Sequence, residues 1–569
     1  MSILRSLGET ISQWNNPFCD PRTRRTTLLI IIALGALFRV TMCFVGYPHQ
    51  LHADEMNVIE PAIDMIERNS YLSYVYFHPD HFQIKICALL FNVYSLVRYG
   101  VDAASVGAIP AFYVIARLFT AMCGIAMIPV AHCLLERIKR GAGVFAAFTV
   151  AFFPAYITHS GYASPDVPLS LIILVLIYLG LRHLENGGIG TVVAMGVATA
   201  IGMTTKYPAA VCCFYVAGII VIEGIRSRGA KVVALRVLVV AAVAFVCLFA
   251  ISPNLVTDLG SVLASLKNES RTVHLGADGL GFFGNLWFYV TGLFSIPDAT
   301  YNDTPYTNLE SIAFLVVGVV WLARRKARYL IPFSLCLLLW LCLSVFGLHW
   351  LRWGLPMYAG PLVMMGLGLY VAVAAAATLL ARGLPALQPF GGTGRRNVVV
   401  LRVAGVVIAL LAAVYSLNAL VSSAALAKTS VVPQTRVEAL AYCEENGIAP
   451  QNSAFDGYTP FSFRLAGSAR DSFVDATSLI PAENEGIEYI VISSYMYERY
   501  YSSDVGNADA VSFYDAVKSK CDLVREWKAT EIEQTPFGFV NLIAKIGYLA
   551  TPMDECLAGP DIEIYRIPS

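Results

Sequence analysis

The chain of 569 residues is 57% hydrophobic and only 14% charged, against roughly 25% charged residues in an average soluble domain. Its apolar residues fall into separate runs, each about as long as the roughly 20 residues that a helix needs to cross a bilayer. These features exclude the soluble, fibrous and disordered classes and indicate an α-helical polytopic membrane protein.

The formal net charge of zero conceals two unlike parts. Residues 425–569 carry 11 basic and 21 acidic residues, whereas residues 1–424 carry 29 basic and 19 acidic ones. We therefore expect a membrane portion over 1–424 followed by an acidic soluble domain over 425–569. Neither part has the clustered basic face of a nucleic-acid binder, so no nucleic-acid partner is expected.

The first apolar run begins near Thr26 and is predicted to be a signal anchor, with no cleaved signal peptide before it. Cytoplasmic loops are enriched in Lys and Arg, so the basic residues in front of this run place the N-terminus in the cytoplasm. These residues are Arg22, Arg24 and Arg25.

Successive spans must cross the membrane in alternating directions, and this requirement predicts a long external loop after the first span. The run 110–135 ends in a basic cluster over 136–140 and therefore runs inward. The apolar segment 82–99 then cannot be a span, because a span there would place that cluster outside. We expect 47–110 to be one external loop with amphipathic helices on the membrane surface.

Eleven spans are predicted in all, at about 26–46, 110–135, 142–162, 167–183, 188–205, 207–223, 232–252, 308–323, 329–347, 354–380 and 398–420. A second external loop is expected over 253–307, in which 282–297 is a candidate re-entrant or surface helix. The protein is thus predicted to be a multi-pass cell-membrane protein with an extracytoplasmic C-terminal domain.

That domain mixes helix and strand signals and is predicted to be a small α/β domain. Residues 489–494 have the pattern of a buried strand, and 562–567 alternate like an edge strand. Cys443, Cys521 and Cys556 allow at most one disulfide within it. The sequence has no Cys/His spacing typical of a metal site.

Several ionisable residues lie at the predicted external ends of apolar segments. They are Asp54, Glu55, Arg117, Asp166, Lys206 and Arg352. The basic ones among them are exceptions to the enrichment of Lys and Arg on the cytoplasmic side. Charges at membrane depth are costly and usually line a cavity. The sequence therefore predicts one external cavity at membrane level in which carboxylates face cations.

Such a cavity suits displacement at a carbon whose leaving group is a lipid phosphate. Cations stabilise the departing negative charge, and a carboxylate accepts the proton of the acceptor hydroxyl. A polytopic transporter or lipid flippase would use the same residue types and is the alternative. It would be expected to show inverted repeats and broken helix pairs, which the sequence does not display.

Each residue also has a purely structural interpretation. Asp54 and Glu55 fit a solvated loop pair, and Asp166 fits a helix N-cap. Lys206 and Arg352 fit interfacial anchors. What favours a site is that all of them are predicted on the same side of the membrane.

The external segments form an ordered series, namely 52–64 with Asp54-Glu55, 77–82 with His78, 160–166, 202–208, 252–255, 271–276 and 349–356. Over about 26–370 this series resembles the GT-C glycosyltransferases, and within them family 39, the protein O-mannosyltransferase-like and aminoarabinose-transferase-like enzymes. Two positions depart from the family pattern: 77–82 lacks the second Pro of its His-Pro-Pro-Leu stretch, and Trp353 replaces a Tyr.

The resemblance implies inverting transfer of a monosaccharide from a polyprenyl-phosphate donor to a lipid, glycan or protein hydroxyl on the external face. It implies that Asp54 is the base and that Glu55 assists acceptor binding. The implied substrate-binding residues are Asp166, Lys206, Arg352, Arg117, Lys85, His78 and His274. Some members use a divalent metal and others do not, and the metal requirement of this chain stays open.

Overall fold

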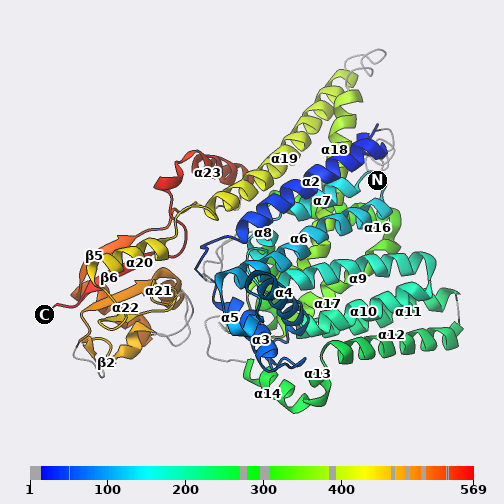
Figure 1. The fold of residues 1–569 in the computed structure, drawn as a ribbon. Helices are drawn as coiled ribbons and strands as arrows, with labels where there is room; N and C mark the ends of the chain where they lie inside the picture. The colour runs from blue at the N-terminus through cyan, green and yellow to red at the C-terminus, as the bar shows by residue number, and fades with distance from the viewer. Residues whose placement is uncertain are drawn as a thin grey trace.

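The computed structural model describes residues 14–49, 52–227, 229–269, 279–294, 308–382, 393–462, 468–481, 486–501, 508–532, 535 and 537–568. Its larger part is a bundle of helices that run side by side (Figure 1). A smaller α/β part made by the C-terminal residues lies at one end of this bundle.

The first half of the bundle begins with η1 (Pro17–Cys19) and α2 (Pro21–Met42) and continues through η2 (Ala53–Glu55), α3 (Met56–Glu67), α4 (His81–Tyr99), α5 (Ala103–Val106), α6 (Pro110–Ile138), α7 (Gly143–Ala151) and α8 (Pro154–His159). It is followed by α9 (Asp166–Asn186), α10 (Ile189–Thr205), η3 (Tyr207–Ala210), α11 (Val211–Ser227) and α12 (Gly229–Ile251).

The second half contains α13 (Asn254–Thr257), α14 (Leu259–Glu269), α15 (Gly281–Leu293), α16 (Glu310–Lys326), η4 (Ala327–Phe333), α17 (Ser334–Ser344), η5 (Leu351–Gly354), α18 (Leu355–Arg382) and α19 (Thr393–Thr429). The candidate re-entrant segment is α15, which packs against α17 and η5. It is a helix of 13 residues, too short to cross a bilayer by itself.

Eight helical stretches of the described chain are long and apolar enough to cross a membrane. One of them, Glu310–Ser344, contains two of the predicted spans joined by η4. The predicted span 188–205 is the 17-residue helix α10, and the predicted span 142–162 is divided into α7 and α8. Helices therefore occupy all eleven predicted positions, and the chain is a multi-pass helical membrane protein.

The break between α7 and α8 is stabilised by a buried arginine from α2. Pro154 begins α8 and has no N–H to continue the ladder of hydrogen bonds. Arg39, fully buried, donates from Nη1 to the carbonyl of Ala151 (2.8 Å) and from Nη2 to that of Val150 (3.0 Å). The cation thereby satisfies carbonyl groups that water cannot reach at this depth.

The segment after α2 forms a separate layer. Helices α3, α4 and α5 bury a second apolar core against α6, with Ile59, Ile84, Phe91 and Phe112 at its centre. Figure 1 shows α4 almost along its axis, whereas α9 to α12 run across the view. Helix α4 is also not among the candidate spans. Helix α4 therefore runs crosswise to α9–α12, and the external position of this segment stays a prediction.

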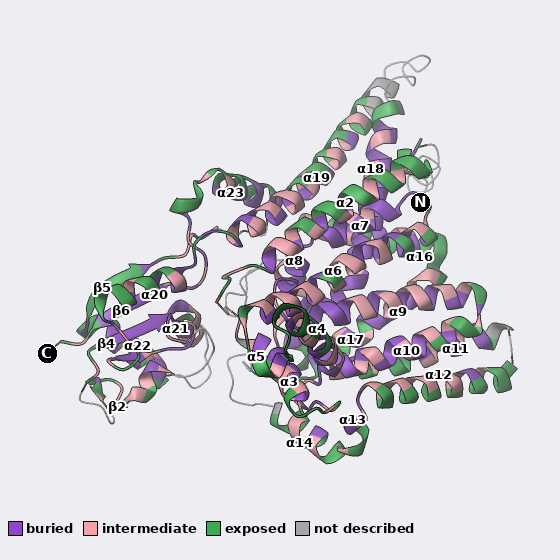
Figure 2. Ribbon diagram, in the orientation of Figure 1, coloured by how far each residue is buried: buried purple, intermediate pink, exposed green. Residues whose placement is uncertain are grey.

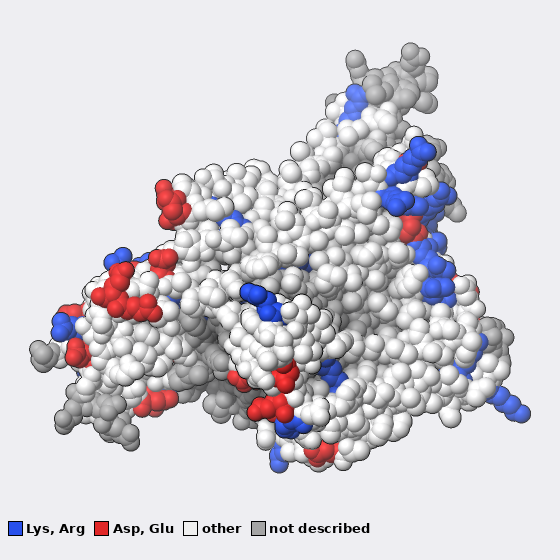
Figure 3. All heavy atoms as spheres, in the orientation of Figure 1, with Lys and Arg blue, Asp and Glu red and all other residues white. Residues whose placement is uncertain are grey.

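Charge is distributed unevenly along the bundle. On the face shown in Figure 3, Lys and Arg gather at the end where the N-terminus lies, and Asp and Glu gather on the C-terminal part. Buried residues concentrate inside the bundle, whereas α12 and α19 carry many exposed apolar side chains (Figure 2). Such exposure is expected of helices that face lipid.

The C-terminal part is built on a four-stranded sheet of order β1-β4-β6-β5. Its strands are β1 (Ser453–Phe455), β4 (Tyr489–Ser493), β5 (Asp522–Trp527) and β6 (Ile562–Arg566), with a separate hairpin of β2 (Phe473–Asp475) and β3 (Ile480–Pro481). The helices are α20 (Thr435–Asn446), α21 (Ser494–Tyr501), α22 (Ala508–Lys520) and α23 (Gly538–Ala550), with η6 (Ala469–Ser472) and η7 (Met553–Glu555).

The prediction of a buried strand over 489–494 is confirmed by β4, which pairs in parallel with β1 and antiparallel with β6. The prediction that 562–567 is an edge strand is wrong, because β6 lies between β4 and β5. Its polar residue Glu563 is buried and accepts a hydrogen bond from the hydroxyl of Tyr565 (2.6 Å). The alternation of β6 thus comes from a satisfied buried carboxylate and not from solvent exposure.

Candidate active site

Most of the predicted site residues gather at one end of the bundle. Asp166 begins α9, Lys206 follows the end of α10, and Arg352 precedes α18. Successive spans run in opposite directions, so the start of α9 and the end of α10 lie at the same end. Asp54 and Glu55, in η2, reach this end from the first loop. Alternating helix direction is therefore what collects these distant residues.

Asp54 and Arg352 form an ion pair, with Asp54 Oδ2 2.5 Å from Arg352 Nη2. The carboxylate side chain is 37% exposed and the guanidinium side chain 22% exposed. Both groups can therefore be reached by a molecule that enters from outside the bundle. Among the described pairs of the cluster, this is the one that solvent and substrate can touch on both partners.

The environment of Asp54 keeps its carboxylate ionised. Burial by itself would raise the pKa of Asp54, but the positive charge of Arg352 outweighs this effect and holds the pKa well below its usual range. The backbone N–H of Asp54 donates to His52 Nδ1 (3.2 Å). Burial lowers the pKa of His52, which favours the neutral ring that can accept this hydrogen bond.

Asp166 and Lys206 form a second, more deeply buried pair. Lys206 Nζ lies 2.7 Å from Asp166 Oδ1, and the lysine and aspartate side chains are 9% and 2% exposed. The ammonium also lies over the ring of Trp353, 5.1 Å from its centroid. The charges of Asp166 and Arg352 attract each other as well. The two pairs therefore form one alternating cluster of two carboxylates and two cations.

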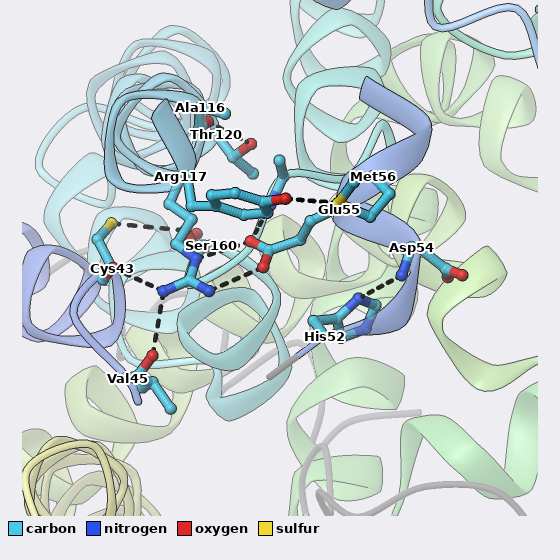
Figure 4. A network of polar contacts seen from close by, with 12 residues as sticks. Cys43, Val45, His52, Asp54, Glu55, Met56, Ala116, Arg117, Thr120 and Ser160 are labelled. Atoms are coloured by element: carbon cyan, nitrogen blue, oxygen red, sulfur yellow. Dashed lines mark hydrogen bonds and ion pairs between the residues drawn. The ribbon is translucent and has the colours of Figure 1, made fainter. Parts of the chain in front are cut away.

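Glu55 points away from the side chain of Asp54 and binds Arg117 (Figure 4). Arg117 donates from Nε to Glu55 Oε1 (2.7 Å) and from Nη2 to Oε2 (2.8 Å), and both side chains are buried. Its Nη1 donates to the carbonyls of Cys43 and Val45, and Glu55 Oε1 also accepts from the N–H of Ala163. This pair therefore ties the end of α2 to η2, α6 and the loop before α9.

His78 and Asp80 add a further pair from the loop before α4. His78 Nδ1 lies 2.6 Å from Asp80 Oδ2, and Asp80 is fully buried. Burial raises the pKa of Asp80, although the charges of His78 and Lys206 act in the opposite direction. His78 also interacts electrostatically with Asp54. The predicted substrate-binding residue His78 thus lies at the edge of the cluster.

The other predicted residues lie elsewhere or outside the described chain. Lys85 Nζ donates to the carbonyl of Tyr71 and lies 3.5 Å from the centroid of the Tyr71 ring. Burial lowers the pKa of Lys85 to about 8. Within the described ranges, this ammonium forms no ion pair with the two carboxylates of the cluster. His274 lies outside the described residues.

Four residues near the cluster were not predicted from the sequence. His52 stacks on Tyr162 with ring centroids 3.9 Å apart, and the Tyr162 hydroxyl contacts His159 Nδ1. The fourth is Asp80, described above. Of these four, only Asp80 could have been found from the sequence, because it lies two residues from His78. The positions of the other three depend on how distant segments pack. In the part of the chain that the structure describes, no group of three or more His, Cys, Asp or Glu is placed to hold a metal ion.

The family comparison finds a match within the first half of the chain. Residues 31–263 match the family model described as dolichyl-phosphate-mannose-protein mannosyltransferase. This matched part of the membrane portion is similar to the GT-C glycosyltransferases. The predicted resemblance is thereby confirmed. The matched range includes Asp54, Asp166 and Lys206 and ends before Arg352, so the match covers three of the four residues of the ion-pair cluster.

Solved GT-C structures resemble the chain at low identity. The structure of ArnT from Cupriavidus metallidurans bound to undecaprenyl phosphate is 15% identical with a TM-score of 0.48, covering 83% of this chain and 94% of that one. The oligosaccharyltransferase AglB from Archaeoglobus fulgidus, in complex with an inhibitory peptide and a dolichol-phosphate, is 12% identical with a TM-score of 0.44, covering 95% and 89%. Arabinosyltransferase EmbB from Mycobacterium smegmatis is 11% identical with a TM-score of 0.42, covering 71% and 40%. The comparison with curated proteins finds no match.

Proposed function

We propose that this GT-C protein is an inverting glycosyltransferase that moves a monosaccharide from a polyprenyl-phosphate donor to an acceptor hydroxyl. The observation that carries the proposal is the Asp54–Arg352 pair beside the Asp166–Lys206 pair. One accessible carboxylate and two cations at the membrane-level end of the spans are what this reaction needs. The lipid phosphates bound in the ArnT and AglB structures agree with such a donor.

In the proposed reaction, the acceptor oxygen attacks the anomeric carbon of the donor from the face opposite the phosphate. A new carbon–oxygen bond forms while the bond between that carbon and the phosphate oxygen breaks. The hydroxyl proton passes to Asp54, and the bonding electron pair leaves with the phosphate. The products are an inverted glycoside and a polyprenyl phosphate, and charge is conserved throughout.

Arg352 has two successive partners in this scheme. In the structure its guanidinium binds Asp54, and a donor phosphate is a better match for the same bidentate fork. When the phosphate draws Arg352 away, Asp54 loses the charge that depresses its pKa and becomes a stronger base. Donor binding would thus prepare the base, and the base would stay paired while the site is empty.

Asp166 and Lys206 complete the donor site in this proposal. Lys206 supplies the second cation for the phosphate, and its pairing with Asp166 holds the ammonium at the site until the donor binds. Asp166 accepts hydrogen bonds from sugar hydroxyls when Lys206 turns toward the phosphate. Glu55 and Arg117 are assigned a supporting role, because both are buried and bind each other. Lys85, bound to Tyr71, is not assigned to the phosphate.

The proposed orientation places the cluster and residues 425–569 outside the cell, with 1–424 as the membrane domain. Its support is the gathering of basic residues at the opposite end of the bundle (Figure 3). The loops over 47–110 and 253–307 then lie on the external side with the site.

The test is transfer by the purified full chain in proteoliposomes supplied with a panel of polyprenyl-phosphate monosaccharides. Release of polyprenyl phosphate that depends on Asp54 supports the proposal. Movement of the intact donor across the bilayer without release of its phosphate would instead identify a flippase. Mass spectrometry of glycans and glycolipids from cells with and without the chain then identifies the sugar and the acceptor.

A further inference from the structure

Helix α23 has its polar residues buried and its apolar residues exposed. Asn541 and Lys545 are 0% and 6% exposed, whereas Phe539, Ile543 and Ile546 are between 51% and 60% exposed. A helix on the surface of a soluble domain has the opposite arrangement. The exposed face of α23 therefore does not suit contact with water.

The polar face of α23 is held by the membrane portion and not by the C-terminal sheet. Asn541 Nδ2 donates to Asn308 Oδ1 (2.6 Å), and the N–H of Gly538 donates to Glu310 Oε2 (3.2 Å) at the start of α16. Lys545 Nζ donates to Ser422 Oγ on α19 (2.8 Å). These contacts come from two spans and fix which way the helix faces.

A further contact closes the end of α23. Lys428 Nζ, near the end of α19, donates to the carbonyl of Tyr548 (2.6 Å) and to that of Thr551. With the polar face bound in this way, Phe539, Ile543 and Ile546 point away from the bundle. The apolar face is consequently an outer surface of the molecule.

This face lies where a bilayer surface meets the bundle. The end of α19 is at the same end as Arg352, because α18 and α19 run in opposite directions (Figure 1). Leu417 on α19 and Val431 just after it are 51% and 55% exposed. Helix α23 packs against α19, so Leu417 and Val431 add exposed apolar positions beside it on the last span. At this end of the bundle, the environment that suits these exposed apolar side chains is the outer part of the bilayer's hydrocarbon layer.

We propose that α23 is an interfacial anchor whose apolar face inserts among the acyl chains of the leaflet at the site's end of the bundle. The partner is the lipid bilayer itself. The exposed charged residues that flank the helix are acidic, namely Glu531, Asp554 and Glu555. Attachment therefore depends on apolar burial and not on attraction to anionic headgroups. The anchor would hold the C-terminal part at the end of the bundle where the Asp54–Arg352 pair lies.

The test places a tryptophan on this face in the full chain. Ile543→Trp is compared with Leu523→Trp on β5, a position of similar exposure on the C-terminal sheet. Each variant is reconstituted in phosphatidylcholine vesicles with brominated acyl chains. Its fluorescence is measured as the difference from the parent chain with its 7 native tryptophans. Ile546→Trp repeats the measurement if Ile543→Trp folds poorly.

The expected result is that brominated lipid quenches the added fluorescence of Ile543→Trp several-fold more than that of Leu523→Trp, whereas aqueous iodide quenches only Leu523→Trp. High salt or added anionic lipid leaves the difference unchanged. Quenching of both variants by iodide alone would show an exposed surface and overturn the anchor. Protection of the Ile543→Trp variant from both quenchers would show that a second copy or another protein covers α23, which overturns it equally.

Discussion

Arg352 Nη2 lies 2.5 Å from Asp54 Oδ2, and this contact joins η5 to η2 in the segment between α2 and α6. The pair makes the accessible carboxylate of the site a weak base while no donor is bound, because the cation stabilises its ionised form. It also leaves the guanidinium in reach of a competing anion. Under the proposed function, the Asp54–Arg352 contact is therefore the point at which donor binding and base strength would be coupled.

Asp54→Asn should lower single-turnover transfer by at least about 10²-fold, the usual scale for loss of a general base. Donor affinity should be largely retained, since the amide preserves the shape of the side chain. The matched control is Asp64→Asn, the same change at an exposed ion pair with Arg68 on α3. Near-normal transfer by Asp54→Asn would refute the assignment of the base. Loss of donor binding with intact chemistry would move Asp54 to a binding role.

Arg352→Gln should move the acid limb of the pH–rate profile upward. In the wild-type chain the depressed pKa keeps Asp54 ionised down to pH values below the ordinary carboxylate range. Without the cation, burial dominates and raises the pKa of Asp54. Activity relative to the optimum should then fall at a higher pH than in wild type. The profile of kcat/KM checks this, and an unchanged acid limb would show that Asp54 is not the titrating base.

Lys206→Ala should weaken transition-state stabilisation by about 2–4 kcal/mol, as expected for loss of a charge-assisted contact to a phosphate. Because this change leaves Asp166 buried without its partner, thermal unfolding must be measured alongside. Lys206→Ala with Asp166→Asn removes the uncompensated charge and should recover stability without recovering transfer. Lys267→Ala, at an exposed residue of α14, is the control. Wild-type kinetics in folded Lys206→Ala would reduce Lys206 to a structural residue.

Glu55→Gln should destabilise the fold by about 3–5 kcal/mol, because it leaves the buried Arg117 charge without its partner. Glu55→Met combined with Arg117→Met removes both charges and should cost clearly less. Thermal unfolding in detergent measures both variants. If the single variant unfolds like wild type and loses only acceptor binding, Glu55 contacts the acceptor after all, and the supporting role proposed for it is wrong.

Impermeant thiol labelling tests the orientation. Glu67→Cys and Val101→Cys, both between α2 and α6, should react from outside intact cells, whereas Ile189→Cys at the start of α10 should react only after permeabilisation. All three positions are exposed. A background free of reactive native cysteines is required, since Cys19, Cys133 and Cys213 are exposed. Labelling of Val101→Cys only from inside would contradict the eleven-span parity.

The helical membrane class and the positions of the spans followed from the sequence, because the need to satisfy every backbone polar group in lipid leaves few solutions. The end of the bundle at which Asp54, Asp166, Lys206 and Arg352 meet was also predictable. Each of these charges is expensive at membrane depth, and alternating span direction determines where it lies. Residues 489–494 were similarly recognisable as a buried strand from their composition alone.

Which charge binds which was decided only by the tertiary structure. Asp54 and Glu55 are adjacent in the sequence, yet one faces Arg352 and the other faces Arg117, because consecutive residues of η2 point in different directions. The central position of β6 and the outward apolar face of α23 depend in the same way on packing. Partner choice needs the three-dimensional distances between segments that are remote in the chain, and periodicity along one segment contains no information about those distances.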